Sequence, residues 1–167
     1  MNIKRFKNFG LLEFIVLSSL LYVVSTLIWT ASTRSAVEEK ANQIKSNHKM
    51  VVDFLNDQVN NCSQNPSSNT LWGEACNNVW TSKKIVIYIL NNFKLDNPYS
   101  IKKNLIQPSN DPRIQAEGKA GQSTDKGIIF VSSQNFDPDP GSEWIVGTCV
   151  KSPCVAAGNN ELVSIYR

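Results

Sequence analysis

Four cysteines are the residues best suited to chemistry in this 167-residue chain. They form two pairs along the sequence, Cys62 with Cys76 and Cys149 with Cys154, separated by 13 and by four intervening residues. Neither spacing matches a zinc ligand set, and His48 is the one histidine that could add a nitrogen ligand. Disulfides in an oxidising compartment therefore explain the cysteines best. Four cysteines allow three pairings, and we expect the local one, Cys62–Cys76 with Cys149–Cys154.

The single histidine also limits catalysis, because a Ser or Cys nucleophile needs a histidine base. His48 falls on the apolar stripe of a predicted helix, so we expect it to be packed and bonded to a nearby carbonyl oxygen. The acidic residues are scattered, and residues 118–121 lack the spacing of a phosphate-binding loop. We therefore expect no enzyme activity, no cofactor and no metal site.

Glu13 is a carboxylate at the start of an apolar run. The twenty residues Phe14–Thr33 carry no charge, and as a helix they would span roughly 30 Å, the hydrocarbon thickness of a bilayer. Lys4, Arg5 and Lys7 precede the run, so the positive-inside rule places the N-terminus in the cytoplasm and the rest of the chain outside. We expect one membrane span followed by an external domain.

The net charge of +3 belongs to this N-terminal part. Residues 35–167 carry 13 basic and 13 acidic side chains, so the external domain is neutral. A nucleic-acid groove needs a surplus of Lys and Arg on the folded domain. The charge distribution therefore argues against nucleic acid as a partner.

The elements that must position these residues begin with one long helix. Apolar residues recur every three or four positions over 37–59, and no Pro or Gly follows Gly10 in this region, which predicts a continuous helix from about Leu11 to Asn60. Residues 83–93 are rich in β-branched side chains, but their apolar spacing favours a second helix. Turn residues and prolines predict an irregular segment over 96–125.

The C-terminal part has the pattern of a small sheet. Residues 127–132, 143–150 and 161–166 are predicted to be three strands, and their short connections indicate an antiparallel meander. The predicted fold class is α+β: one long N-terminal helix, whose first half spans the membrane, packs on a small antiparallel sheet and is stapled by disulfides.

The residues around Glu13 resemble the N-terminus of type IV pilins. Residues 7–16 read KNFGLLEFIV: after a basic leader, an aromatic residue is followed four positions later by Glu inside an apolar helix. Asn8 stands where the family has Gly before the aromatic residue. The predicted long helix, Cys-stapled loop, small sheet and C-terminal disulfide loop are also similar to pilin architecture.

The resemblance implies processing by a prepilin peptidase, which would cut between Asn8 and Phe9 and methylate the new amine. It divides the chain into a basic leader over 1–8, a membrane-spanning and filament-core helix over 9–34, and a periplasmic or extracellular globular head over 35–167. Before assembly the subunit would lie in the inner membrane as a single-pass protein with a cytoplasmic N-terminus.

The resemblance also implies a function. Inner-membrane assembly machinery would add the subunit, a major or minor pilin, to a homopolymer, and this extracellular pilus would serve adhesion or motility. Glu13 would pair with the Phe9 amine of a neighbouring subunit, because a carboxylate in an apolar core is costly unless paired.

Two other functions remain open. A pseudopilin of a type II secretion system would share the anchor, although the principal subunit of those systems typically has a calcium-bearing loop and no disulfide. A monomeric, membrane-anchored binding module would have the same anchor without polymerising. Asn8 favours that last function and Glu13 argues against it.

Overall fold

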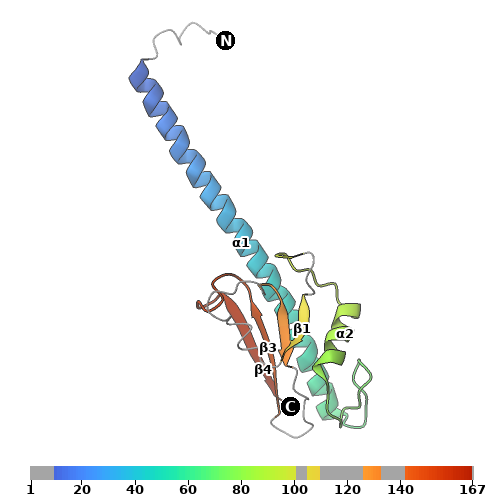
Figure 1. The fold of residues 1–167 in the computed structure, drawn as a ribbon. Helices are drawn as coiled ribbons and strands as arrows, with labels where there is room; N and C mark the ends of the chain where they lie inside the picture. The colour runs from blue at the N-terminus through green and yellow to red at the C-terminus, as the bar shows by residue number, and fades with distance from the viewer. Residues whose placement is uncertain (1–9, 101–104, 110–125, 133–141, 167) are drawn as a thin grey trace. The chain divides into compact units, whose positions relative to one another are not determined.

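The structure, a computed structural model, describes residues 10–100, 105–109, 126–132 and 142–166 (Figure 1). The chain forms two compact units, Met1–Glu38 and Glu39–Arg167. Its elements in chain order are the helices α1 (Leu11–Gln64) and α2 (Ser82–Asn92), then the strands β1 (Ile106–Ser109), β2 (Ile129–Ser132), β3 (Glu143–Cys149) and β4 (Asn160–Tyr166).

The long helix predicted from the sequence is present as α1, which has 54 residues and continues past Asn60 to Gln64. In its second half the buried positions recur every three or four residues, which matches the predicted amphipathic pattern. The buried residues of α1 are Ala41, Ile44, Asn47, His48, Val51, Val52, Leu55, Gln58, Val59 and Cys62. This side of the helix packs into the core of the second unit.

The segment that could have been a strand or a helix is the helix α2. It buries Ile85, Val86 and Ile89 against the same core and leaves Ile87 and Leu90 exposed. Buried residues three and four positions apart form one apolar side of a helix, whereas a half-buried strand would bury every second residue. The spacing of the apolar residues, which favours a helix, was therefore a better guide than the β-branched composition, which favours a strand.

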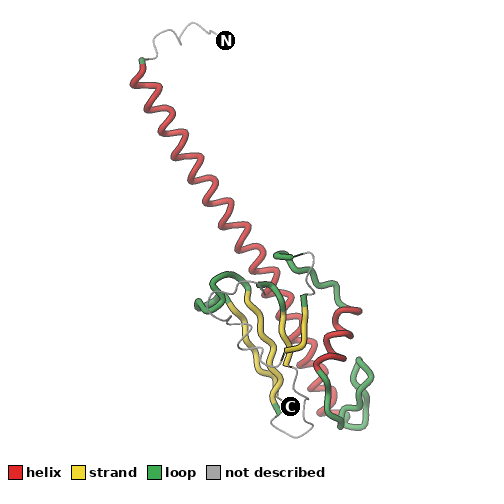
Figure 2. The backbone as a smooth tube through the Cα atoms, viewed as in Figure 1, coloured by secondary structure: helices red, strands yellow, loops and turns green. Residues whose placement is uncertain are grey.

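The sheet is mixed, so the prediction of a purely antiparallel sheet was wrong. Its strand order is β1-β2-β3-β4, and the strands lie side by side in Figure 2. The pairs β2–β3 and β3–β4 are antiparallel, as the predicted meander requires. β1 is an additional strand that pairs with β2 in parallel, with Ile106 opposite Ile129.

The strand β1 lies inside the segment predicted to be irregular. It has four residues and contains Pro108, which has no N–H to donate to a ladder. A strand of this kind is tolerated at the edge of a sheet, and β1 is an edge strand. Its short length and its proline explain why the sequence pattern indicates a loop here.

One hydrophobic core joins the elements of the second unit. Its members come from α1, α2 and all four strands, and the largest fully buried side chains are Trp80 and Trp144. The structure contains the disulfides Cys62–Cys76 and Cys149–Cys154, which is the local pairing. The first closes the loop that follows α1, and the second closes the connection from β3 to β4.

Candidate functional site

The first turn of α1 positions Glu13. Gly10 precedes the helix, and its carbonyl oxygen accepts the Phe14 N–H at 3.2 Å. The Gly10 N–H in turn donates to a carboxylate oxygen of Glu13. A Glu at the third helical position that accepts from the N-cap backbone forms half of a capping box, and its charge also suits the helix dipole. Glu13 therefore caps α1 within its own chain.

The absence of a side chain at Gly10 gives this carboxylate its room. A Cβ atom built on Gly10 would lie 2.8 Å from Oε2 of Glu13, which is closer than carbon and oxygen normally approach. The expected processing residues, Asn8 and Phe9, lie outside the described residues. Of the predicted assembly pair, the structure thus describes Glu13 alone.

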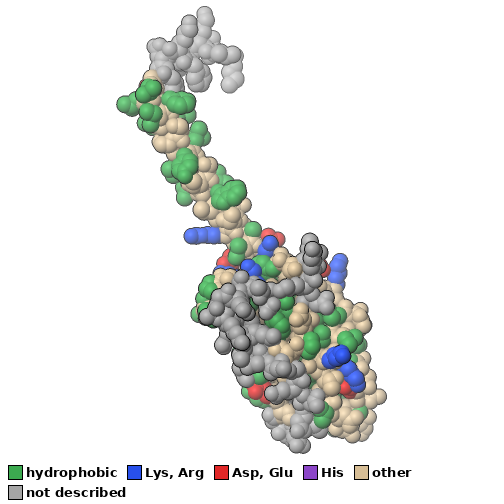
Figure 3. Space-filling model, in the orientation of Figure 1, with side chains coloured by type: hydrophobic (Ala, Val, Ile, Leu, Met, Phe, Trp, Pro, Cys, Tyr) green, Lys and Arg blue, Asp and Glu red, His purple; other side chains and the backbone are tan. Residues whose placement is uncertain are grey.

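The apolar part of α1 is exposed on all sides. Every residue over 10–40 is exposed in the single chain, and hydrophobic side chains run along this segment in Figure 3. Tyr22 and Trp29 are 71% and 73% exposed. Proteins rarely leave a contiguous apolar patch of this size in water. By length and composition α1 can cross a membrane, and it is the one helix among the described residues that can.

All Ser and Thr hydroxyl groups over 18–35 except that of Ser32 are satisfied inside the helix. Seven Ser and Thr side chains donate to carbonyl oxygens one turn earlier, at 2.8 to 3.4 Å, namely those of Ser18, Ser19, Ser25, Thr26, Thr30, Thr33 and Ser35. Such bonds need no water. A helix in lipid or in a dry helix bundle requires this kind of satisfaction.

Small hydroxyl residues also recur every seven positions. The pairs are Ser18 with Ser19, Ser25 with Thr26, and Ser32 with Thr33. Residues seven apart lie within about 20° of one another around a helix, so the pairs form a stripe along one side. We call these six residues the hydroxyl stripe.

The side of the apolar segment that carries the hydroxyl stripe alternates small and large side chains. Tyr22 and Trp29 fall between its pairs on the same side, while Leu20, Leu27 and Ala31 fall on the opposite side. Small residues between large ones leave gaps into which the side chains of a second helix can pack. Sequence reasoning missed this stripe, although its signal, the period of seven, was present in the residues.

His48 ties α1 to the sheet, as predicted. Its side chain is buried, and Nε2 lies 3.2 Å from the carbonyl oxygen of Val146 in β3. Burial lowers the pKa of His48, opposed in part by this hydrogen bond and by the charge of Glu161. Lys45 and Glu161 form a half-exposed ion pair at 3.0 Å between α1 and β4. These contacts give His48 a structural role.

Glu74 organises the loop closed by Cys62–Cys76. Its side chain is only 8% exposed and forms an ion pair with Lys84 at 3.0 Å. The same carboxylate accepts the Trp72 indole N–H at 2.8 Å and the Thr81 backbone N–H at 3.2 Å. Sequence reasoning missed Glu74, because a glutamate in a loop rich in Asn and Ser is usually solvated.

Two residues hold the loop closed by Cys149–Cys154. The Asn159 side chain donates to the Pro153 carbonyl oxygen at 2.9 Å, and the Asn160 side chain donates to the Cys154 carbonyl oxygen at 2.6 Å. Across the described ranges, no three His, Cys, Asp or Glu side chains gather where they could hold a metal ion.

The candidate site is therefore the apolar segment of α1 with Glu13 in its first turn and the hydroxyl stripe along one side. Comparison of the chain with models of protein families, with curated proteins and with solved structures finds no match.

Proposed function

We propose that this protein is a structural subunit of a type IV pilus that polymerises through the apolar segment of α1. One observation carries the proposal: a fully exposed apolar helical segment begins with a single carboxylate, Glu13, and belongs to the same helix that packs into a disulfide-bonded head. The resemblance of residues 7–16 to the pilin N-terminus supports it.

The exposed apolar surface must be buried in two successive environments, first the membrane and then the filament. Before assembly the segment 14–33 lies in the inner membrane, where lipid covers it. In the filament, the same segments of other subunits cover it, because large side chains of one helix can pack into the gaps that small residues leave on another. The hydroxyl stripe is one contact side, and Glu13, Leu20 and Leu27 lie on the other. A bundle in which each helix has several neighbours uses both sides.

Glu13 needs a partner of opposite charge in such a bundle. The Gly10 N–H caps this carboxylate but leaves its charge uncompensated. Cleavage before Phe9 removes Lys4, Arg5 and Lys7 and creates an α-amine. The Phe9 amine of a neighbouring subunit then pairs with Glu13, which neutralises the carboxylate and sets the stagger between adjacent helices.

Two alternatives use the same anchor. A type II secretion pseudopilin forms a short periplasmic filament, and the two disulfides favour a pilin over it. A monomeric anchored binding module has no need for Glu13, but the Asn8 that precedes the cut favours it. Adhesion or motility then follows from what the exposed head contacts on the finished filament.

Intact-mass and N-terminal analysis of the protein from sheared filaments and from membranes tests the proposal. We expect a mature chain that begins at methylated Phe9, and we expect Asn8→Gly to speed its appearance. A chain that retains residues 1–8 and occurs only in the membrane fraction would overturn the proposal in favour of the anchored binding module. A processed chain confined to a periplasmic filament would favour the pseudopilin.

A further inference from the structure

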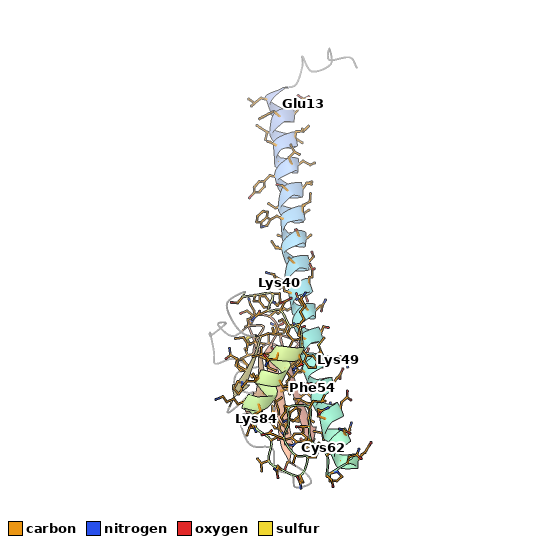
Figure 4. The ribbon with its side chains drawn as sticks, turned by 90° about the vertical axis from the view of Figure 1, so that its right-hand side faces the viewer. Glu13, Lys40, Lys49, Phe54, Cys62 and Lys84 are labelled. Atoms are coloured by element: carbon orange, nitrogen blue, oxygen red, sulfur yellow. A yellow bond between two sulfur atoms is a disulfide. The ribbon has the colours of Figure 1, made fainter. Side chains whose placement is uncertain are left out.

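An open depression lies on the exposed side of α2, in the second unit. Its volume is about 450 Å³, within the range of small-ligand sites. The loop closed by Cys62–Cys76 contributes Trp72, and α2 contributes Lys84, Ile87, Tyr88, Asn91 and Asn92. Figure 4 looks onto this side, with Lys84 labelled on α2 and Phe54 between α2 and α1. The apolar segment of α1 contributes nothing to it.

Two aromatic rings line the depression, and the core holds both of them. The Trp72 ring packs edge-on against Trp80, with 5.1 Å between ring centroids, and its N–H is bonded to Glu74. The Tyr88 ring stacks on Phe54 at 5.7 Å with an interplanar angle of 8°. Because the indole N–H is already used, Trp72 offers only apolar ring surface. Rings held in this way need little ordering when a ligand arrives.

Free hydrogen-bonding groups lie beside these rings. Asn92 donates to the Tyr88 carbonyl oxygen at 2.8 Å, which leaves its own side-chain oxygen free to accept. Within the described part of the chain, the Asn91 amide and the Tyr88 hydroxyl have no hydrogen-bond partner. Two amides and a phenol can each donate to or accept from a ligand hydroxyl.

The charges that line the depression cancel. Among the described residues, Lys84 is the one charged residue that lines the depression, and its ammonium group is paired with the buried Glu74 carboxylate at 3.0 Å. A site for phosphate, sulfate or a carboxylated ligand would offer uncompensated cations. The lining therefore selects an uncharged ligand.

We infer that this depression binds a neutral carbohydrate. A sugar ring has an apolar face of C–H groups, which packs on aromatic rings such as those of Trp72 and Tyr88. Its hydroxyls are both donors and acceptors, as the amides of Asn91 and Asn92 are. A second protein chain would bury about 800 Å² on each partner around an apolar centre. Exposed amides that can still donate and accept, beside rings that the core holds, suit a sugar better.

The test uses the full chain in lipid nanodiscs, because the sugar headgroup of an alkyl-glycoside detergent would compete for the site. The probes are an array of neutral oligosaccharides and of sialylated and sulfated ones, followed by titration of the tightest neutral compound. We expect neutral compounds to bind and acidic ones to bind no better. In saturation-transfer spectra, the face of one sugar ring receives most of the signal.

Variants locate the binding. We expect Asn91→Ala to weaken binding about tenfold, because it removes two hydrogen bonds to the ligand. We expect Tyr88→Phe to weaken binding about threefold, because it removes one. Asn77→Ala is the matched control, because Asn77 is also an exposed asparagine, between Cys76 and α2, but does not line the depression. Neither α2 variant removes a core contact, so both retain the wild-type thermal unfolding profile.

Four results would overturn the inference. They are no binding of any neutral oligosaccharide, binding of acidic compounds alone, equal weakening by Asn91→Ala and Asn77→Ala, and self-association of the head that Asn91→Ala abolishes. The last result would assign the depression to a second copy of the chain. None of them bears on filament assembly, which the N-terminal analysis tests separately.

Discussion

The Nε2 atom of His48 lies 3.2 Å from the carbonyl oxygen of Val146, a residue 98 positions later in the chain. A carbonyl oxygen can only accept, so Nε2 carries the proton that is shared. The contact joins the buried side of α1 to an inner strand of the sheet, β3. Lys45 and Glu161 form an ion pair nearby, between α1 and β4. Helix and sheet are thus held together by polar contacts as well as by the core.

This relationship predicts that the head loses stability in mild acid. Burial lowers the pKa of His48 below its ordinary 6.5 in the folded state, so the unfolded chain binds a proton that the folded chain does not. The free energy of unfolding is therefore greatest above pH 6.5 and falls as the pH drops below it. Urea unfolding with the disulfides intact, followed by tryptophan fluorescence at a series of pH values, measures the slope.

His48→Gln is the control for this pH dependence. Glutamine can donate to the Val146 carbonyl oxygen but does not titrate. We expect the variant to be nearly flat between pH 6.5 and the range in which carboxylates titrate. The same slope in wild type and variant would assign the acid sensitivity to other groups.

Local patterns predicted most of the fold. The helical period predicted the buried side of α1 from Ala41 to Val59, because residues spaced three and four apart lie on one side of a helix, whereas Val37 at the start of the pattern is exposed. The strand β1 could not be predicted, since Ile106–Ser109 is short, contains a proline and is defined by its parallel pairing with β2. That pairing is not a property of the segment itself. β2 begins at Ile129 and not at Gly127, because Gly127 adopts a φ of 81° in a turn.

The site also contains one residue that its own sequence context reveals and one whose role depends on the fold. Glu13 stands out in the sequence, because a charge in an apolar run is unusual wherever the helix lies. Glu74 does not, because its burial depends on how Trp72 and Thr81 fold around it across the loop. A charge within an apolar run, such as Glu13, can be recognised from the sequence, whereas the buried and paired Glu74 can be recognised only from the folded loop.

Removing the Glu74 carboxylate should destabilise the head. Glu74→Ala leaves the partly buried Trp72 indole N–H and Thr81 backbone N–H without their acceptor, which should cost at most about 1–3 kcal/mol. Lys84→Ala removes an exposed cation but leaves the Glu74 carboxylate with the hydrogen bonds from Trp72 and Thr81, so it should cost less than Glu74→Ala. Urea unfolding at neutral pH compares the two. Equal losses would mean that the ion pair, and not the two hydrogen bonds, holds the loop.

Added bulk on the hydroxyl stripe should weaken assembly. Ser25→Leu fills the gap between Tyr22 and Trp29 on the side where we expect a neighbouring helix to pack, so we expect a severalfold lower yield of sheared filaments at an unchanged membrane level of subunit. Ala31→Leu adds similar bulk on the opposite side of the same segment and is the matched control. A greater loss with Ala31→Leu would assign the closest helix contact to the opposite side.

Two substitutions of Glu13 separate its charge from its capping role. Glu13→Ala removes both the charge and the acceptor of the Gly10 N–H, whereas Glu13→Gln keeps an oxygen acceptor and loses only the charge. Because the proposed pairing with the Phe9 amine of a neighbour needs a carboxylate, we expect both variants to be processed and inserted but to form few filaments. Filament counts by electron microscopy measure this. Normal filaments from Glu13→Gln with few from Glu13→Ala would reduce the role of Glu13 to capping the helix.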